Sequence, residues 1–151
     1  MKNATQNYIK HPYELFGIEC GKGWHSLLKP IFDYIEKYNQ DKTEEDKIKI
    51  IQIKEKFGGL RVYTNFHTDE LDEIISNAED ESFSTCETCG TKKNVGSTVG
   101  WMSTCCKDCV IKHAEKSYYP LKWYSFTDKK CYWVYDDGRL EDAGKIDENK
   151  F

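Results

Sequence analysis

The sequence predicts an α+β protein in which a small antiparallel sheet and amphipathic helices are followed by a compact unit built around four cysteines. Three patterns carry this prediction. Apolar residues recur at helical spacing in two segments, an alternating stretch is interrupted by Gly-Gly, and two C-x2-C pairs stand 16 residues apart. A chain of 151 residues suits one domain with a subdomain. We therefore divide it into an α+β core (1–83), a cysteine subdomain (84–119) and an aromatic C-terminal hairpin extension (120–151).

The first element is a helix in GWHSLLKPIFDYIEKYNQ, where Trp24, Leu28, Ile31 and Ile35 share one face. Proline has no N–H to donate, so the regular helix is expected to begin just before Pro30 or to be kinked there. The polar and aperiodic segment YNQDKTEEDK follows, and it predicts a loop.

The stretch QIKEKFGGLRVY predicts a β-hairpin, because two alternating strands flank a pair of glycines that tolerate positive φ. With Gly58 and Gly59 as the two turn residues, Lys56 lies opposite Arg61. A different turn length would rearrange the faces. In the expected register one face carries Ile51, Ile53, Phe57, Leu60, Val62 and Phe66, with Glu55 as an anomaly, and the other carries Gln52, Lys54, Lys56, Arg61, Tyr63 and Asn65.

The polar face of this hairpin has two interpretations. Like charges in directly opposite positions repel each other, so Lys56 and Arg61 favour an anion between them. In one interpretation both side chains reach into solvent or pair with acidic residues of the same chain. In the other, Lys54, Lys56, Arg61 and Tyr63 bind a phosphate-bearing, nucleotide-like ligand or an acidic protein surface. Glu55 is expected to pair with a nearby cation rather than to act as a catalytic acid.

The segment TDELDEIISNAEDESF predicts a second amphipathic helix. Thr68 is the expected N-cap, and acidic residues occupy the first turn, where they suit the positive end of the helix dipole. The apolar face comprises Leu71, Ile74, Ile75 and Ala78.

The cysteines predict a structural zinc site. There are seven, and an odd number without an export signal argues against a disulfide framework. Cys86 and Cys89 form one C-x2-C pair, Cys106 and Cys109 form the second, and two thiolates at this spacing can reach one ion from a tight knuckle. Because four thiolates close the tetrahedron, the zinc is expected to stabilise the fold rather than to catalyse.

The segments around the two pairs resemble the treble-clef and zinc-ribbon class. They comprise a knuckle ending at Gly90, a glycine-punctuated hairpin in NVGSTVGWMST, and a helix that runs from the second pair toward Pro120. Cys105 is expected to pack as a small hydrophobe, and His113 to lie on the helix surface. Farther on, KKCYWVYDDGRLEDAG predicts a strand, an Asp-Asp-Gly turn and a return strand.

Charge and hydropathy limit the partners and the location. The net charge of −4 argues against wholesale non-specific DNA binding. No apolar run approaches the roughly 20 residues that a membrane span needs, and the N-terminal MKNATQNYIKHPYE lacks the apolar core of a signal peptide. We therefore expect a cytoplasmic protein that does not insert into membranes.

Residues 84–125 form the only basic stretch, which gives an alternative function. In this alternative the chain is a nucleic-acid-binding zinc-ribbon accessory protein, with Trp101 as a stacking residue. The competing expectation is that Trp101 covers the metal knuckle. The basic residues concerned are Lys92, Lys93, Lys107 and Lys112.

The motifs of common enzyme classes are missing. Cys20 and His25 are close in sequence, but no acidic partner or oxyanion-hole motif accompanies them, so Cys20 is expected to pack. The sequence contains no P-loop, dinucleotide-binding fingerprint, HExxH or paired-carboxylate nuclease motif. We therefore expect a binding protein rather than an enzyme.

Three stretches together, GKGWHSLL, QIKEKFGGLRVY and CETCG…GWMSTCCKDC, resemble a family of small bacteriophage and prophage proteins. The resemblance covers about Gly21 to Cys109. The residue before the third cysteine of that pattern is usually apolar, which favours Cys106 over Cys105 as the ligand. The insertion NQDKTEEDK and the aromatic tail from Tyr118 have no counterpart. The family supplies no activity, but small accessory phage proteins often bind and block host factors, including defence systems. The resemblance therefore implies a host–virus interaction in the host cytoplasm.

Overall fold

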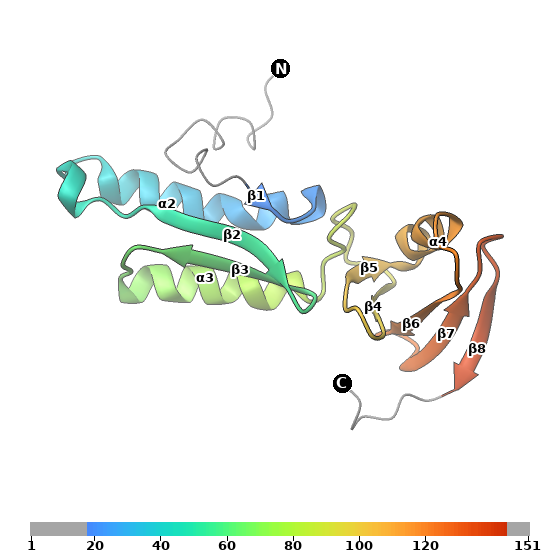
Figure 1. The fold of residues 1–151 in the computed structure, drawn as a ribbon. Helices are drawn as coiled ribbons and strands as arrows, with labels where there is room; N and C mark the ends of the chain where they lie inside the picture. The colour runs from blue at the N-terminus through green and yellow to red at the C-terminus, as the bar shows by residue number, and fades with distance from the viewer. Residues whose placement is uncertain (1–17, 145–151) are drawn as a thin grey trace, which may run out of the picture.

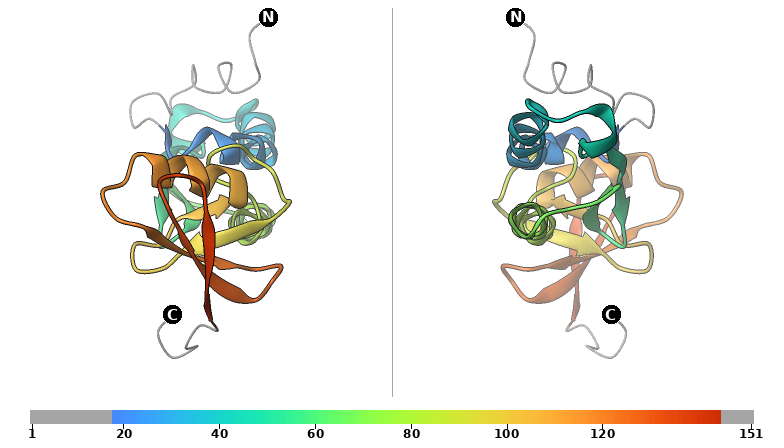
Figure 2. Two further views of the ribbon diagram at one scale, coloured as in Figure 1. Left: turned by 90° about the vertical axis from the view of Figure 1, so that its right-hand side faces the viewer. Right: turned by 90° about the vertical axis from the view of Figure 1, so that its left-hand side faces the viewer.

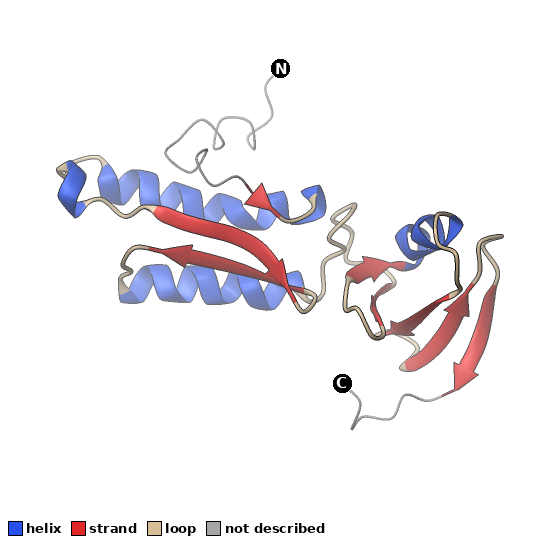
Figure 3. Ribbon diagram, in the orientation of Figure 1, coloured by secondary structure: helices blue, strands red, loops and turns tan. Residues whose placement is uncertain are grey.

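The computed structural model describes residues 18–144, which form two groups of elements with a sheet in each (Figure 1). We call residues 18–83 the N-terminal unit and residues 84–144 the cysteine unit. The outer ends of the predicted segments, residues 1–17 and 145–151, lie outside the described residues. The N-terminal unit contains β1 (Ile18–Glu19), the 3-10 helix η2 (Lys22–Leu28), α2 (Lys29–Asn39), the 3-10 turn η3 (Glu44–Asp46), β2 (Ile50–Lys56), β3 (Gly59–Thr64) and α3 (Asp69–Ser82). The cysteine unit contains β4 (Val95–Thr98), β5 (Thr104–Cys106), α4 (Lys107–Glu115), β6 (Leu121–Ser125), β7 (Lys130–Val134) and β8 (Leu140–Gly144) (Figure 3).

The sheet of the N-terminal unit has the order β1-β2-β3, and both long helices lie on the same side of it (Figure 2). β2 and β3 are antiparallel, as predicted, but the short β1 pairs with β2 in parallel, so the sheet is mixed. The strand β1, which is only two residues long, was not predicted. The core between the sheet and the helices includes Trp24, Leu28, Ile31, Ile35, Ile53, Leu60, Val62 and Leu71.

Local signals for the helix ends agree with the structure. Pro30 lies in the first turn of α2, where a missing N–H costs no hydrogen bond, and the preceding residues form the 3-10 helix η2 instead. Thr68 is the N-cap of α3, and its Oγ1 accepts a hydrogen bond from the backbone N–H of Leu71 (3.1 Å). The helices therefore begin where the sequence predicts.

The hairpin turn differs from the expected one. β2 and β3 pair with Lys54, and not Lys56, opposite Arg61. The turn residues are Phe57 and Gly58, whose φ angles are 52° and 81°. Positive φ at both central residues is what a type I′ turn requires. The predicted pairing of Lys56 with Arg61 is therefore wrong, because the turn begins one residue earlier than the Gly-Gly pair suggests.

Two residues expected in the core consequently face outward. Phe57 is 70% exposed at the tip of the hairpin, and Ile51 is 46% exposed. A register shift between Ile50 and Gln52 accounts for the second, because it turns Ile50 into the core instead. The opposite face of the sheet still carries the predicted polar set, which we call the cationic face: Lys54, Lys56, Arg61 and Tyr63.

The sheet of the cysteine unit has the order β5-β4-β6-β7-β8. β4 and β5 form the expected hairpin, α4 begins at the second cysteine pair, and β7 and β8 form the expected C-terminal hairpin. The strand β6 was not predicted, and it pairs with β4. Trp123 on β6 is buried, and its Nε1 donates a hydrogen bond to the carbonyl oxygen of Cys105 (3.1 Å). The C-terminal strands thus continue the sheet that carries the cysteines.

The GKGW segment joins the two units. The backbone N–H of Gly23 donates to the carbonyl oxygen of Glu87 (2.7 Å), and Trp24 Nε1 donates to that of Thr85 (2.8 Å). A Cβ at Gly23 would lie 2.2 Å from the carbonyl oxygen of Cys86, so only glycine fits this approach. The first cysteine knuckle therefore rests directly on the GKGW backbone.

The tip of the β2–β3 hairpin forms a second contact between the units. Thr104 Oγ1 donates a hydrogen bond to the carbonyl oxygen of Gly58 (2.6 Å). A Cβ at Gly59 would lie 2.4 Å from the ring of Phe83. A side chain at position 59 would therefore displace the Phe83 ring within the N-terminal unit, while Gly58 serves the turn.

Candidate metal centre

Four cysteines meet at one point of the cysteine unit. The sulfur atoms of Cys86, Cys89, Cys106 and Cys109 all lie within 4.8 Å of one another. The loop between α3 and β4 supplies the first pair, and the junction of β5 and α4 supplies the second. Cys89 is exposed and the other three are buried. These are the four ligands that the spacing predicts, and together they could hold a metal ion.

Backbone hydrogen bonds shape the first pair into a tight turn. The N–H of Gly90 donates to the carbonyl oxygen of Cys86 (2.9 Å), and the N–H of Cys86 donates to that of Thr91 (2.8 Å). Gly90 has a φ of 82°, which a residue with a Cβ adopts only with strain. The glycine after the second cysteine therefore allows both thiols to point the same way.

The second pair lies at the start of a helix. Cys106 is the N-cap of α4, and its sulfur accepts the backbone N–H of Cys109 (3.4 Å). The N-terminus of a helix favours negative charge, so this position suits a thiolate.

The donor set fits a tetrahedral soft metal ion. With metal–sulfur bonds of about 2.3 Å, the sulfurs of such a site lie about 3.8 Å apart. The sulfurs of Cys89 and Cys106 are 3.7 Å apart. Burial raises the pKa of Cys86, but backbone hydrogen bonds from Cys89, Cys106 and Thr88 outweigh it and lower that pKa to about 7. Burial instead raises the pKa of the Cys106 and Cys109 thiols.

The neighbouring candidates stay out of this cluster. Cys105 is fully buried on β5, and burial raises the pKa of its thiol to about 12. It therefore packs as an apolar side chain. His113 is exposed on α4, and its Nε2 lies 3.3 Å from Thr88 Oγ1. Cys105 is therefore buried and His113 lies on the helix surface, as predicted for each.

The lysines of the basic stretch lie close to the cysteines. Lys93, Lys107 and Lys112 line a hollow of about 370 Å³ that Cys89, Cys106 and Cys109 also line. Four thiolates on a divalent ion carry a net charge of about −2, which nearby ammonium groups offset. Lys92 forms an ion pair with Glu81. Charge balance around a bound ion is therefore an alternative to nucleic-acid binding for Lys93, Lys107 and Lys112.

The cations of the cationic face form no salt bridge within the described part of the chain. Among residues 18–144, no carboxylate lies within 4 Å of Lys54, Lys56 or Arg61. Lys54 Nζ lies 5.8 Å from the ring centre of Tyr63, and Arg61 donates to the carbonyl oxygen of Leu60 (3.2 Å). Within the described part of the chain, the expected pairing with acids of the same chain is therefore not found.

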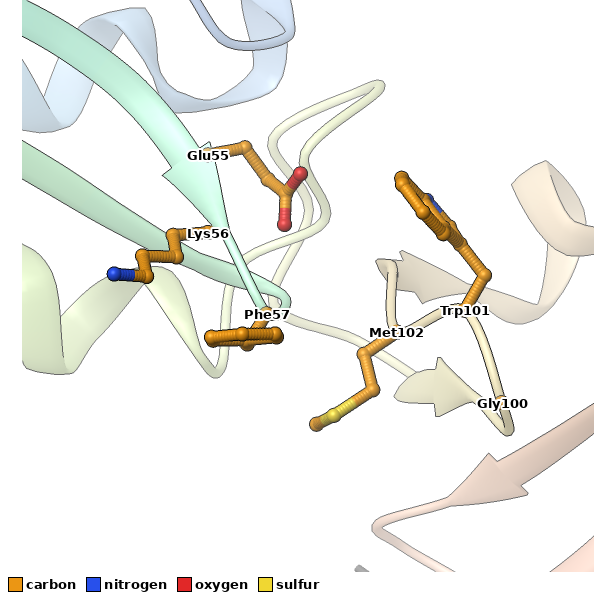
Figure 4. Close-up of a pocket in the computed structure, with 6 residues that line it drawn as sticks. All are labelled: Glu55, Lys56, Phe57, Gly100, Trp101 and Met102. Carbon is orange, nitrogen blue, oxygen red and sulfur yellow. The ribbon is translucent and has the colours of Figure 1, made fainter.

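Trp101 does not cover the metal knuckle. It is 86% exposed in the β4–β5 loop and lines a cavity together with Glu55, Lys56, Phe57, Gly100 and Met102 (Figure 4). Glu55 does not pair with a cation as expected, but accepts the backbone N–H of Gly58 (2.8 Å). Phe57 and Met102 were not predicted to line a site, because Phe57 was expected in the core.

Cys20 and His25 do not form a nucleophilic pair. Burial and the charge of Glu87 raise the pKa of Cys20 to about 12, so its thiol is protonated at neutral pH and a poor nucleophile. Burial, together with Lys22, lowers the pKa of His25, and its Nε2 is buried without a hydrogen-bond partner. Both groups belong to the packing of the η2 segment.

None of the helices in residues 18–144 has the length and apolar character required to cross a bilayer.

Comparisons with protein-family models, with curated proteins and with solved structures find no match to this chain.

Proposed function

We propose that this chain is a non-enzymatic binding protein that is stabilised by zinc and recognises an anionic partner through the cationic face. Zinc is the ion that four closely spaced thiolates favour in a site of this geometry. The knuckle, the β4–β5 hairpin and the helix α4 follow one another in treble-clef order. All four coordination positions are filled by sulfur, so the ion serves stability and leaves no place for a substrate.

The binding role is proposed from the two opposed cations of the cationic face. Lys54 and Arg61 are directly opposite each other on β2 and β3, with no carboxylate within 4 Å among the described residues. Like charges in this position cost a few tenths of a kcal/mol or more. An anion between them relieves this repulsion and gains charge-assisted hydrogen bonds from the guanidinium.

The resemblance to phage and prophage proteins supports a more specific form of this proposal. In that form the anionic partner is an acidic surface of a host protein or a nucleotide-like ligand of a host pathway. Binding then blocks the host factor, and the site of action is the host cytoplasm. Inhibition of a host defence system is the role of this kind that the resemblance favours.

The test is the substitution Arg61→Gln, with Lys37→Gln as the control. Lys37 is exposed on α2, and its loss changes the net charge equally without touching the cationic face. We expect Arg61→Gln to leave the melting temperature unchanged or slightly higher. It should weaken the binding of ATP, inorganic triphosphate or an oligoglutamate peptide by about 1–3 kcal/mol.

Two measurements separate the outcomes. Calorimetric titration gives the affinity for each probe, and thermal melts give the stability with and without it. A destabilised Arg61→Gln protein whose response to every probe equals that of the wild type would contradict the proposal. Single-stranded DNA is included as a further probe, because an affinity for DNA that falls steeply with salt would favour nucleic-acid binding instead.

A further inference from the structure

A cavity lies between the hairpin tip of the N-terminal unit and the β4–β5 loop of the cysteine unit. Its volume is about 350 Å³. One wall is formed by Glu55, Lys56 and Phe57, and the other by Gly100, Trp101 and Met102 (Figure 4). The cavity is separate from the four cysteines, which line a different hollow. It therefore needs an explanation of its own.

The walls of the cavity expose large aromatic rings. Phe57 is 70% exposed and Trp101 is 86% exposed. Phe57 also holds a φ of 52°, a left-handed conformation that is strained for a residue with a Cβ. Exposed aromatic rings that line one cavity are typical of binding sites.

Hydrogen bonds hold the two walls in place. Thr104 Oγ1 donates to the carbonyl oxygen of Gly58 (2.6 Å), which ties the hairpin tip to β5. In the opposite wall, the backbone N–H of Ser103 donates to Thr98 Oγ1 (2.9 Å), which closes the loop that carries Trp101. The cavity is therefore formed before a ligand arrives, and binding pays little for ordering the backbone.

A carboxylate supplies the charge of the cavity. The Glu55 side chain points toward the space between the hairpin tip and Trp101, whereas the Lys56 ammonium points away from it (Figure 4). Glu55 Oε2 accepts the backbone N–H of Gly58 (2.8 Å), which fixes the carboxylate. Among the described residues, no cation lies within 4 Å of Glu55. A cationic group would therefore complete the site.

We infer that this cavity binds the guanidinium group of an arginine side chain from a partner protein. A guanidinium is planar, so it stacks on the face of an indole ring, and its fork of N–H donors matches a carboxylate. A neutral side chain would instead cover the Glu55 carboxylate without pairing it, which is unfavourable. This inference goes beyond the proposed function, because it concerns the Glu55 carboxylate and a ligand of the opposite charge; the cavity shares only Lys56 with the cationic face, and that ammonium points away from the cavity (Figure 4). A negative result for anion binding at the cationic face would leave the arginine site untouched, and the reverse also holds.

The test compares two blocked tripeptides, Gly-Arg-Gly and Gly-citrulline-Gly, as ligands of the full chain loaded with zinc. Citrulline has the shape of arginine but no charge. The signal is the indole N–H resonance of Trp101, identified by its loss in Trp101→Ala. We expect the arginine peptide to shift this resonance with a dissociation constant in the millimolar range, and the citrulline peptide to bind about 10-fold more weakly.

Variants locate the interaction. Glu55→Gln keeps an acceptor for the Gly58 N–H, so the turn is retained, but it should abolish the preference for arginine over citrulline. Trp101→Ala should remove binding, which line broadening of the arginine resonances would report. Tyr119→Ala is the control, since Tyr119 is 80% exposed outside the cavity, and it should leave binding unchanged.

Three results would overturn the inference. Equal binding of both peptides would show an apolar pocket. Tighter binding of the corresponding lysine peptide would show that a point charge, and not a guanidinium, is recognised. An indole resonance of Trp101 that does not move at saturating arginine peptide would show that the cavity binds neither.

Discussion

The contact between Gly23 and the first cysteine knuckle gives the sharpest prediction for stability. A methyl group at position 23 would lie 2.2 Å from the carbonyl oxygen of Cys86 and 2.6 Å from backbone atoms of Glu87. These neighbours are backbone atoms, so no side-chain rotation can relieve the clash. In Gly23→Ala the knuckle must therefore move away from the η2 segment.

The magnitude follows from what that movement breaks. The hydrogen bonds from Gly23 N–H to Glu87 and from Trp24 Nε1 to Thr85 are lost or lengthened, at about 1 kcal/mol each. Overpacking adds about 1–3 kcal/mol, and the better helix propensity of alanine returns up to about 1 kcal/mol. We expect a net loss of about 2–4 kcal/mol, which lowers the melting temperature by roughly 5–15 °C in a chain of this size.

Gly100→Ala is the matched control. Gly100 has a φ of 91°, but a Cβ there would meet nothing within 4 Å. Its substitution should cost only about 1–2 kcal/mol for the strained backbone. Urea unfolding of the zinc-loaded proteins measures both changes. If Gly23→Ala proves no less stable than Gly100→Ala, the close approach between GKGW and the knuckle is not present in solution.

Three further predictions concern the metal, the C-terminal strands and pH. Cys86→Ser should reduce the bound zinc measured by elemental analysis and destabilise the cysteine unit, whereas Cys105→Ala should keep its zinc; equal zinc content in the two variants would contradict the ligand assignment. Deleting all residues after Tyr119 removes the buried Trp123 and the β6 neighbour of β4, so we expect a lower melting temperature at unchanged zinc concentration; an unaltered melt would show that these strands are dispensable. Burial lowers the pKa of His25, so the unfolded chain binds more protons near pH 6.5, and stability present above that pH is lost as the pH falls through the lowered value. His25→Phe should therefore flatten the fall in melting temperature between about pH 7.5 and about pH 5.5, and equal slopes in the two proteins would refute this.

The metal ligands could be predicted from the sequence because their geometry is local. Two residues between thiols and a following glycine define a knuckle almost without regard to the rest of the fold. The caps and the start of α2 were predicted for the same reason, since Thr68 and Pro30 act within one turn of their own helices. The features that were predicted correctly are therefore those that depend on residues close to one another in sequence.

The hairpin turn could not be assigned in this way. Either Gly58–Gly59 or Phe57–Gly58 can supply a two-residue turn, and in the structure Lys56 pairs with Gly59, which makes Phe57 and Gly58 the turn residues. Gly59 instead lies against the ring of Phe83, a contact between residues distant in sequence. The cavity was missed as a consequence, because it forms only when Phe57 faces outward. The strand β1 was missed because its partner β2 is distant in sequence. The strand β6 was missed although its partner β7 follows closely, and only its pairing with β4 is distant in sequence.

The position of β4 in its sheet has a consequence for synthesis on the ribosome. β4 pairs on one side with β5, which follows it closely, and on the other with β6, which begins at Leu121. The four cysteines therefore leave the ribosome before the strand that completes their sheet. A metal ion bound by the four cysteines at that stage would be in place before β6, β7 and β8 join the sheet.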